Sequence, residues 1–97
     1  MRWYLRAADA GNVQGMLDLG GMYLLGTGVP KDEKAASRWF QEAVELGNPA
    51  AMFDLGWLYE NEKGVPRNLK TALDLYRQAA TAGNAEAKRR LAQLAGS

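Results

Sequence analysis

The sequence predicts an all-α solenoid of about six antiparallel helices, and three observations lead to that prediction. The chain matches itself at an offset of 36 residues, and its apolar residues recur at helical rather than alternate spacing. Glycine, asparagine and proline recur at the boundaries between the helical stretches. Because one helical hairpin cannot cover the resulting apolar stripes, neighbouring hairpins must stack into a solenoid.

The repeat becomes visible when the chain is laid over itself at this offset. Glycine-asparagine pairs recur at residues 11–12, 47–48 and 83–84, and a glycine-valine-proline triplet recurs at 28–30 and 64–66. A residue that the fold requires should recur from unit to unit, whereas one that does not recur is free to serve a function. The recurring residues that we assign to the structure are Leu19, Gly20, Tyr23, Ala43, Leu55, Gly56, Tyr59 and Ala79.

Each unit consists of a shorter helix, a loop rich in glycine and proline, and a second helix. Gly47 can end a helix in the left-handed conformation, Asn48 can cap the next helix, and Pro49 fits its first turn. Asp32 and Asn68 follow the glycine-valine-proline loops and are placed as N-caps of the second helices. In chain order we expect helices over residues 1–10, 13–25, 32–46, 49–61, 68–82 and 85–95.

These elements predict a single repeat domain over the whole chain, residues 1–97. The last helix departs from the pattern, with Lys88 where Met16 and Met52 stand in the earlier units, as suits a capping helix with one solvent-facing side. The expected parts are an unpaired helix of the second type (1–11), the first repeat (12–47), the second repeat (48–83) and a terminal capping helix (84–97).

Composition narrows the function classes. The hydrophobic fraction of 47% and the charged fraction of 24% are typical of soluble globular proteins, and no apolar run approaches the length of a membrane span. The absence of cysteine and histidine excludes disulfides, thiolate metal sites and the commonest general acid or base. No signal peptide is apparent, so we expect a cytoplasmic chain as given, although a parent protein could be periplasmic or secreted.

Candidate catalytic groups are few, and we expect neither an enzyme nor a cofactor. Asp18 and Asp54 are the one carboxylate pair of interest, but they occupy the same place in successive repeats, which favours solvated or cap-like scaffold residues. The glycine-threonine-glycine stretch at residues 26–28 lacks the strand and the lysine that a phosphate loop needs.

The only dense basic run is Lys88, Arg89 and Arg90 in the last helix. It is interpreted first as a solubilising surface whose cations suit the C-terminal half of a helix. The alternative is an anchor for an acidic segment of a partner protein. Nucleic-acid binding is not expected, because one short basic run on a chain of net charge +1 is a poor electrostatic footprint.

The repeating residues resemble those of the Sel1-like repeat (SLR), a relative of the tetratricopeptide repeat with a longer connecting loop. The likeness runs essentially from end to end. It implies a right-handed, tetratricopeptide-like superhelix that serves as an adaptor or scaffold for other proteins, in tasks that include bacterial secretion and envelope functions. The residues that carry the resemblance are Gly47, Asn48, Ala51, Leu55, Gly56, Tyr59, residues 64–66, Ala72, Tyr76, Ala79 and Ala80.

By analogy with tetratricopeptide arrays, a partner would bind the concave surface, which the first helix of each unit lines. Trp57 matches Gly21 and Gln93 in the other units, so the repeat does not demand an indole there. Trp57 is either a contact residue or a local cover for a neighbouring helix, and Phe53 is either scaffold or contact. The residues we assign to the concave groove are Trp57, Phe53, Leu17, Gly21, Leu24, Glu60 and Arg89.

The sequence therefore predicts a non-catalytic interaction scaffold that binds a peptide or a partner helix, with no nucleic acid and no membrane insertion. A monomer is expected. The alternative is a structural unit that assembles end to end or by swapping, or a fragment of a longer repeat array.

Overall fold

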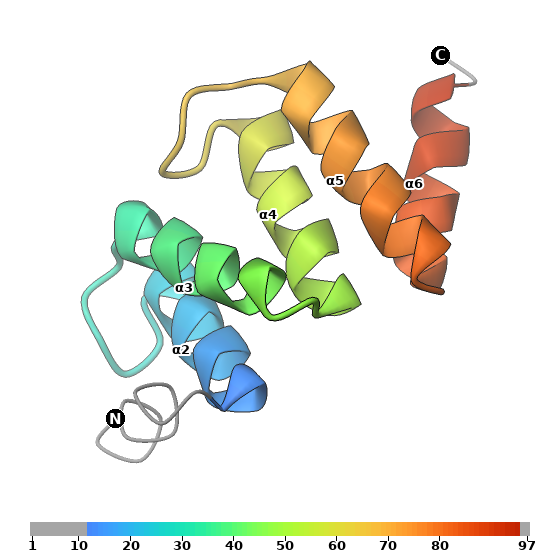
Figure 1. Ribbon diagram of the computed structural model, residues 1–97. Coiled ribbons are helices and arrows are strands. Elements are labelled where there is room, and N and C mark those ends of the chain that lie inside the picture. Colours follow the sequence, from blue (N-terminus) through green and yellow to red (C-terminus); the bar gives the residue numbers. More distant parts are fainter. Residues whose placement is uncertain (1–11, 96–97) are drawn as a thin grey trace.

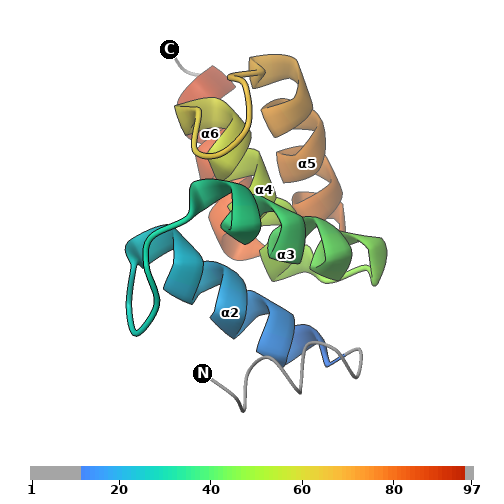
Figure 2. The same cartoon turned by 90° about the vertical axis from the view of Figure 1, so that its left-hand side faces the viewer.

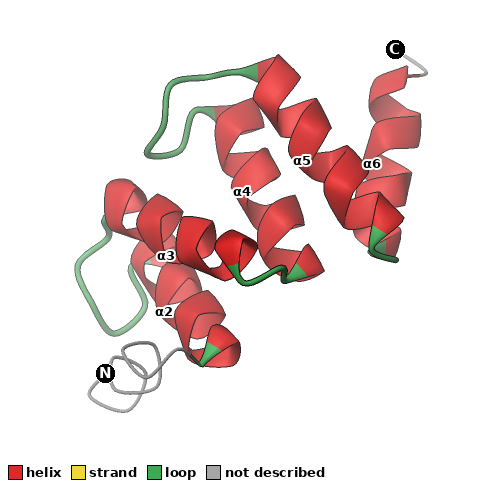
Figure 3. Ribbon diagram, in the orientation of Figure 1, coloured by secondary structure: helices red, strands yellow, loops and turns green. Residues whose placement is uncertain are grey.

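A computed structural model of the protein describes residues 12–95, which form an entirely helical array (Figure 1). Figure 3 shows helices and loops and no strand within these residues. The predicted all-α repeat fold is confirmed, while the helix expected over residues 1–10 lies outside the described residues. The helices are α2 (Val13–Leu25), α3 (Glu33–Glu45), α4 (Pro49–Asn61), α5 (Leu69–Thr81) and α6 (Ala85–Ala95).

Each of these helices begins after an asparagine or aspartate whose side chain accepts a hydrogen bond from the backbone N–H three residues later. The five distances range from 2.8 to 3.1 Å. The N-caps predicted at Asp32, Asn48 and Asn68 are confirmed. Because a cap lies just outside its helix, α3 and α5 begin one residue later than expected.

Short turns and long loops alternate along the chain, and the two long loops lie along the same side of the array (Figure 3). The short turns close at Gly47 and Gly83, whose φ angles of 83° and 98° are in the left-handed region. Each long loop is tied back to the preceding helix by the N-cap residue of the next. The backbone N–H of Asp32 donates to the carbonyl of Tyr23 at 2.8 Å.

Consecutive helices lie side by side and make the main tertiary contacts (Figures 1 and 2). The two recurring glycines of the first helices, Gly20 and Gly56, allow close packing of the second helices. A Cβ atom at Gly20 would lie 2.9 Å from the ring of Phe40, and one at Gly56 would lie 2.9 Å from the ring of Tyr76. Of the other recurring residues, Tyr23 and Tyr59 are half-buried, and the buried ones are Leu19, Ala43, Leu55 and Ala79.

Candidate partner-binding groove

An open apolar groove lies between α2 and α4, with α3 contributing to its floor. It has a volume of about 370 Å³, and one carboxylate interrupts an otherwise apolar lining. The lining residues are Leu17, Gly21, Leu24 and Leu25 of α2, Phe40 of α3, and Phe53, Asp54 and Trp57 of α4. We call this the α2/α4 groove.

The groove brings together most of the residues assigned to it from the sequence. Leu17, Gly21 and Leu24 come from one wall, and Phe53 and Trp57 come from the other. Trp57 is 37% exposed although it is one of the largest side chains in the protein. A large aromatic side chain that is partly exposed in an apolar groove is a typical feature of binding surfaces.

Phe53, which the sequence had presented as either scaffold or contact, is a packing residue that also lines the groove. Its ring packs against the ring of Tyr76 at a centroid distance of 5.5 Å, within the cluster where α4 meets α5 and α6. The same side chain lines the α2/α4 groove. A substitution at Phe53 would therefore change both the packing and the groove, so Trp57 is the better residue to test.

Glu60, which was expected at the edge of the groove, instead belongs to a polar network that joins α4, α5 and α6. The Tyr76 hydroxyl donates to Glu60 Oε1 at 2.6 Å, and Arg90 Nε donates to the same oxygen at 3.0 Å. A second Arg90 nitrogen forms a salt bridge with Glu60 Oε2. The hydrogen bond from Arg90 lowers the pKa of Glu60, while burial opposes that shift. Glu60 is absent from the groove lining.

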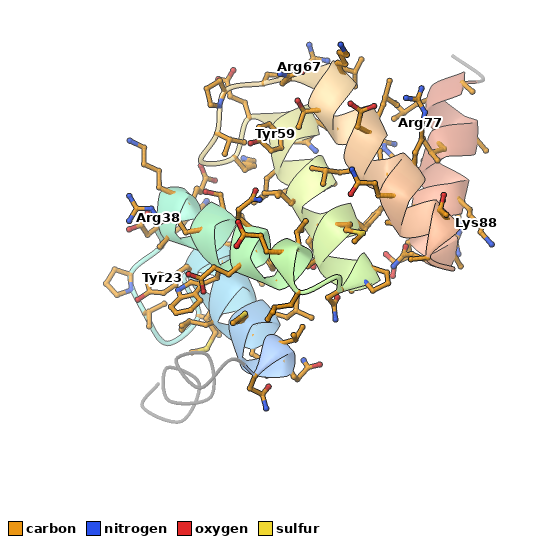
Figure 4. All side chains as sticks on the ribbon, in the orientation of Figure 1. Tyr23, Arg38, Tyr59, Arg67, Arg77 and Lys88 are labelled. Atoms are coloured by element: carbon orange, nitrogen blue, oxygen red, sulfur yellow. The ribbon has the colours of Figure 1, made fainter. Side chains whose placement is uncertain are left out.

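The basic run of α6 is divided between solvent and this network. Lys88 points away from the helices into solvent (Figure 4), and Arg89 is exposed. Arg89 is absent from the lining of the α2/α4 groove, and its neighbour Arg90 forms the ion pair with α4. The structure thus assigns the interhelical role to Arg90, which the sequence had grouped with the solubilising charges.

Asp54 is a groove residue that the sequence had placed among solvated scaffold positions, and that interpretation was wrong. The carboxylate lies among the apolar side chains of the α2/α4 groove. Burial, and next the negative charge of Glu86 on α6, raise the pKa of Asp54 to about 6. Leu25 and Phe40 were also missed; Leu25 is 75% exposed, and Phe40 is a buried core residue that also lines the groove.

A second apolar groove lies between α5 and α6, at the opposite end of the array from α2 (Figure 1). Its volume is about 580 Å³, and it is lined by Leu69, Leu73, Arg77, Leu91, Leu94 and Ala95. We call this the α5/α6 groove.

Within residues 12–95 the structure offers no group of acidic side chains arranged to hold a metal ion. Nor does any helix in that range have the length and apolar character needed to cross a membrane.

The Sel1 repeat family model matches the chain three times, over residues 1–12, 13–48 and 49–84. The chain belongs to the Sel1 repeat family. Proteins of this family are helical repeat scaffolds without a catalytic site, and they generally bind other proteins. No curated protein sequence matches the chain.

Solved structures of Sel1 repeat proteins have the same fold. A Sel1 repeat protein from Oxalobacter formigenes is 39% identical with a TM-score of 0.90, over 95% of this chain and 69% of its own. The protective antigen c5321 of uropathogenic Escherichia coli is 31% identical with a TM-score of 0.88, over 93% of this chain and 19% of its own. Helicobacter pylori cysteine rich protein B is 27% identical with a TM-score of 0.87, over 93% of this chain and 68% of its own.

Proposed function

We propose that this Sel1 repeat protein binds a short segment of another protein in the α2/α4 groove. The observation that carries the proposal is the apolar groove itself, with the indole of Trp57 partly exposed on its wall. Both a peptide and a single helix of a partner fit a trough between two helices. The family's general role in protein binding supports the same class of function.

The repeat supports Trp57 as the central contact. Its equivalents are Gly21 and Gln93, so the fold is built without an indole at the other two positions. Gly21 lies on the facing wall, and a Cβ atom added there would meet no other atom within 4 Å. The glycine therefore leaves room opposite the indole, which is where an apolar side chain of the partner would lie.

Selection from a displayed library of random peptides about twelve residues long tests this function. Wild-type protein should enrich peptides with apolar residues, and Trp57→Ala should weaken their binding by about 30-fold, equivalent to ~2 kcal/mol at a hot spot. Leu46→Ala is the matched control, because Leu46 is 56% exposed and lies in the turn after α3, outside the groove.

The result that would overturn the proposal is equal affinity of the selected peptides for the wild type and for Trp57→Ala. The melting temperatures of both variants must match the wild type within a few degrees, so that lost binding is not lost folding. Gly21→Leu gives an independent measurement, since it fills the space opposite the indole and should also block binding.

Self-assembly is a second candidate function, and the α5/α6 groove favours it. Leu91 of this groove is the repeat equivalent of Leu55, which is buried in a cluster with Leu75 of the following helix. The face of α6 around Leu91 would therefore accept a helix like α5 from a second copy of the chain. Light scattering from micromolar to millimolar concentration tests this. Growth in mass that Leu69→Glu abolishes would support it, and a constant monomer mass would refute it.

A further inference from the structure

The α2/α4 groove has an equivalent one repeat later, between α4 and α6, and the two are filled differently. At the later place Arg90 reaches across from α6 to Glu60 of α4, beside the hydroxyl of Tyr76. The guanidinium of Arg90 thus fills the space between α4 and α6. The residues 36 positions earlier are Leu24 of α2, Phe40 of α3 and Asp54 of α4, and all three line the open groove.

The α2/α4 groove lacks the positive charge and has the carboxylate of Asp54 in its place. Arg90 is replaced by Asp54, and Glu60 is replaced by Leu24, so no internal pair can form between these two positions. None of the ion pairs found within residues 12–95 includes Asp54. The charge that acts on it is that of Glu86, which is also negative. A carboxylate held among apolar side chains without a cation is an unfavourable arrangement that an incoming cation would relieve.

We infer that the segment bound in the α2/α4 groove carries an arginine or lysine beside its apolar residues, and that the cation pairs with Asp54. This rests on the proposed function of the groove and specifies its partner. The apolar stem of the basic side chain would lie on Leu24 and Phe40, which replace the polar Glu60 and Tyr76 of the later unit. Trp57 lies one helical turn from Asp54 and lines the same groove, so its indole would add a cation–π contact to the same basic group.

The peptides selected for groove binding provide the test. Those whose binding depends on Trp57 should be enriched in arginine or lysine next to an apolar residue. Replacing that arginine by citrulline, which keeps the shape and removes the charge, should weaken binding to the wild type about tenfold. On Asp54→Asn the same replacement should change the affinity less than twofold, because the charge that the cation faces has been removed.

A charge transplant gives a second, independent test. The double variant Leu24→Glu/Asp54→Arg installs the pair that closes the later unit, so it should remain folded and lose the basic peptides. Trp57-dependent peptides without basic residues, or an equal citrulline effect on the wild type and on Asp54→Asn, would overturn this inference and leave the proposed function standing. Loss of any Trp57 dependence would instead remove the proposed function, and this inference with it.

Discussion

The two repeat units pack their helices in the same way and differ in what fills the space between successive first helices. In both, a buried glycine of the first helix lies against an aromatic ring of the second, Gly20 against Phe40 and Gly56 against Tyr76. The caps and the loop ties also repeat. Between the first helices, however, the later unit forms a polar network and the earlier unit leaves an apolar groove.

This difference shows which side chains the fold requires and which it can replace. The later unit shows that three polar side chains fit between α4 and α6 and satisfy one another. The α2/α4 groove shows that the solenoid also forms when the equivalent positions are leucine, phenylalanine and aspartate. Since the fold tolerates both fillings, the choice of an open groove with a carboxylate is available for recognition.

Breaking the polar network should have the largest effect on stability. Glu60→Ala leaves the Arg90 guanidinium and the Tyr76 hydroxyl without their shared acceptor. Because Arg90 stays partly in solvent, the free energy of unfolding should fall by about 2 kcal/mol. Leu24→Ala, at the equivalent position of the groove, should cost only about 1 kcal/mol of apolar contact. Urea unfolding of the two variants measures this, and equal losses would contradict the comparison.

The stability cost of Glu60→Ala should depend on pH, whereas that of Leu24→Ala should not. The hydrogen bond from Arg90 keeps the pKa of Glu60 below its ordinary value of 4.5. The network therefore stabilises the fold fully above that pH and loses its contribution as pH falls through the lowered value. The stability difference between the wild type and Glu60→Ala should shrink in acid, whereas the difference for Leu24→Ala should not.

The helix boundaries were predictable from the sequence because the signals that set them are local. An asparagine or aspartate before each helix satisfies its own backbone N–H three residues later, and this needs no distant partner. The position of Trp57 on the groove wall followed from the analogy with tetratricopeptide arrays, and its equivalents Gly21 and Gln93 show that the repeat does not require an indole there.

The environments of the charged residues were not predictable, because they depend on side chains from other helices. Asp18 and Asp54 occupy the same repeat position, but Asp18 accepts a hydrogen bond from Gln14, whereas Asp54 lies within reach of the charge of Glu86. Arg89 and Arg90 are adjacent in one basic run, and the partner that distinguishes Arg90 is thirty residues earlier, on α4. Comparison of equivalent positions detects a residue that differs, but not the contact that a neighbouring helix supplies.

A smaller effect on stability is expected at two consecutive glycines, of which Gly20 belongs to the helix packing and Gly21 to the groove wall. Gly20→Ala should lower the free energy of unfolding by about 1 to 2 kcal/mol, since the added Cβ would lie 2.9 Å from the Phe40 ring. Gly21→Ala should raise it by about 1 kcal/mol, because the Cβ meets nothing within 4 Å and alanine favours the helix. The melting temperatures of the two variants should shift in opposite directions. Shifts of the same sign would contradict the assignment of one glycine to the packing and the other to the groove.

The smallest effect should come from the carboxylate of the groove, and it should depend on pH. Because the pKa of Asp54 is raised from 3.8 to about 6, the folded protein binds more protons than the unfolded chain between these values. Its stability therefore falls as pH rises through that window, and ionised Asp54 disfavours the fold above it. Asp54→Asn should be more stable than the wild type by about 1 kcal/mol at neutral pH, with the difference vanishing near pH 4.

Asp74→Asn is the matched control for that measurement, because Asp74 is an exposed residue of α5 and should change stability by less than about 0.5 kcal/mol. If Asp54→Asn were neutral at every pH, the carboxylate would be as well solvated as Asp74, and the groove would offer a cation no advantage over open surface. If it becomes stabilising as pH rises from about 4 to about 6, the wild-type protein keeps a charge that its own fold disfavours. The equivalent position one repeat later is Arg90, which is paired to a glutamate. The cost at Asp54 is therefore not imposed by the repeat and is best explained by a cationic partner.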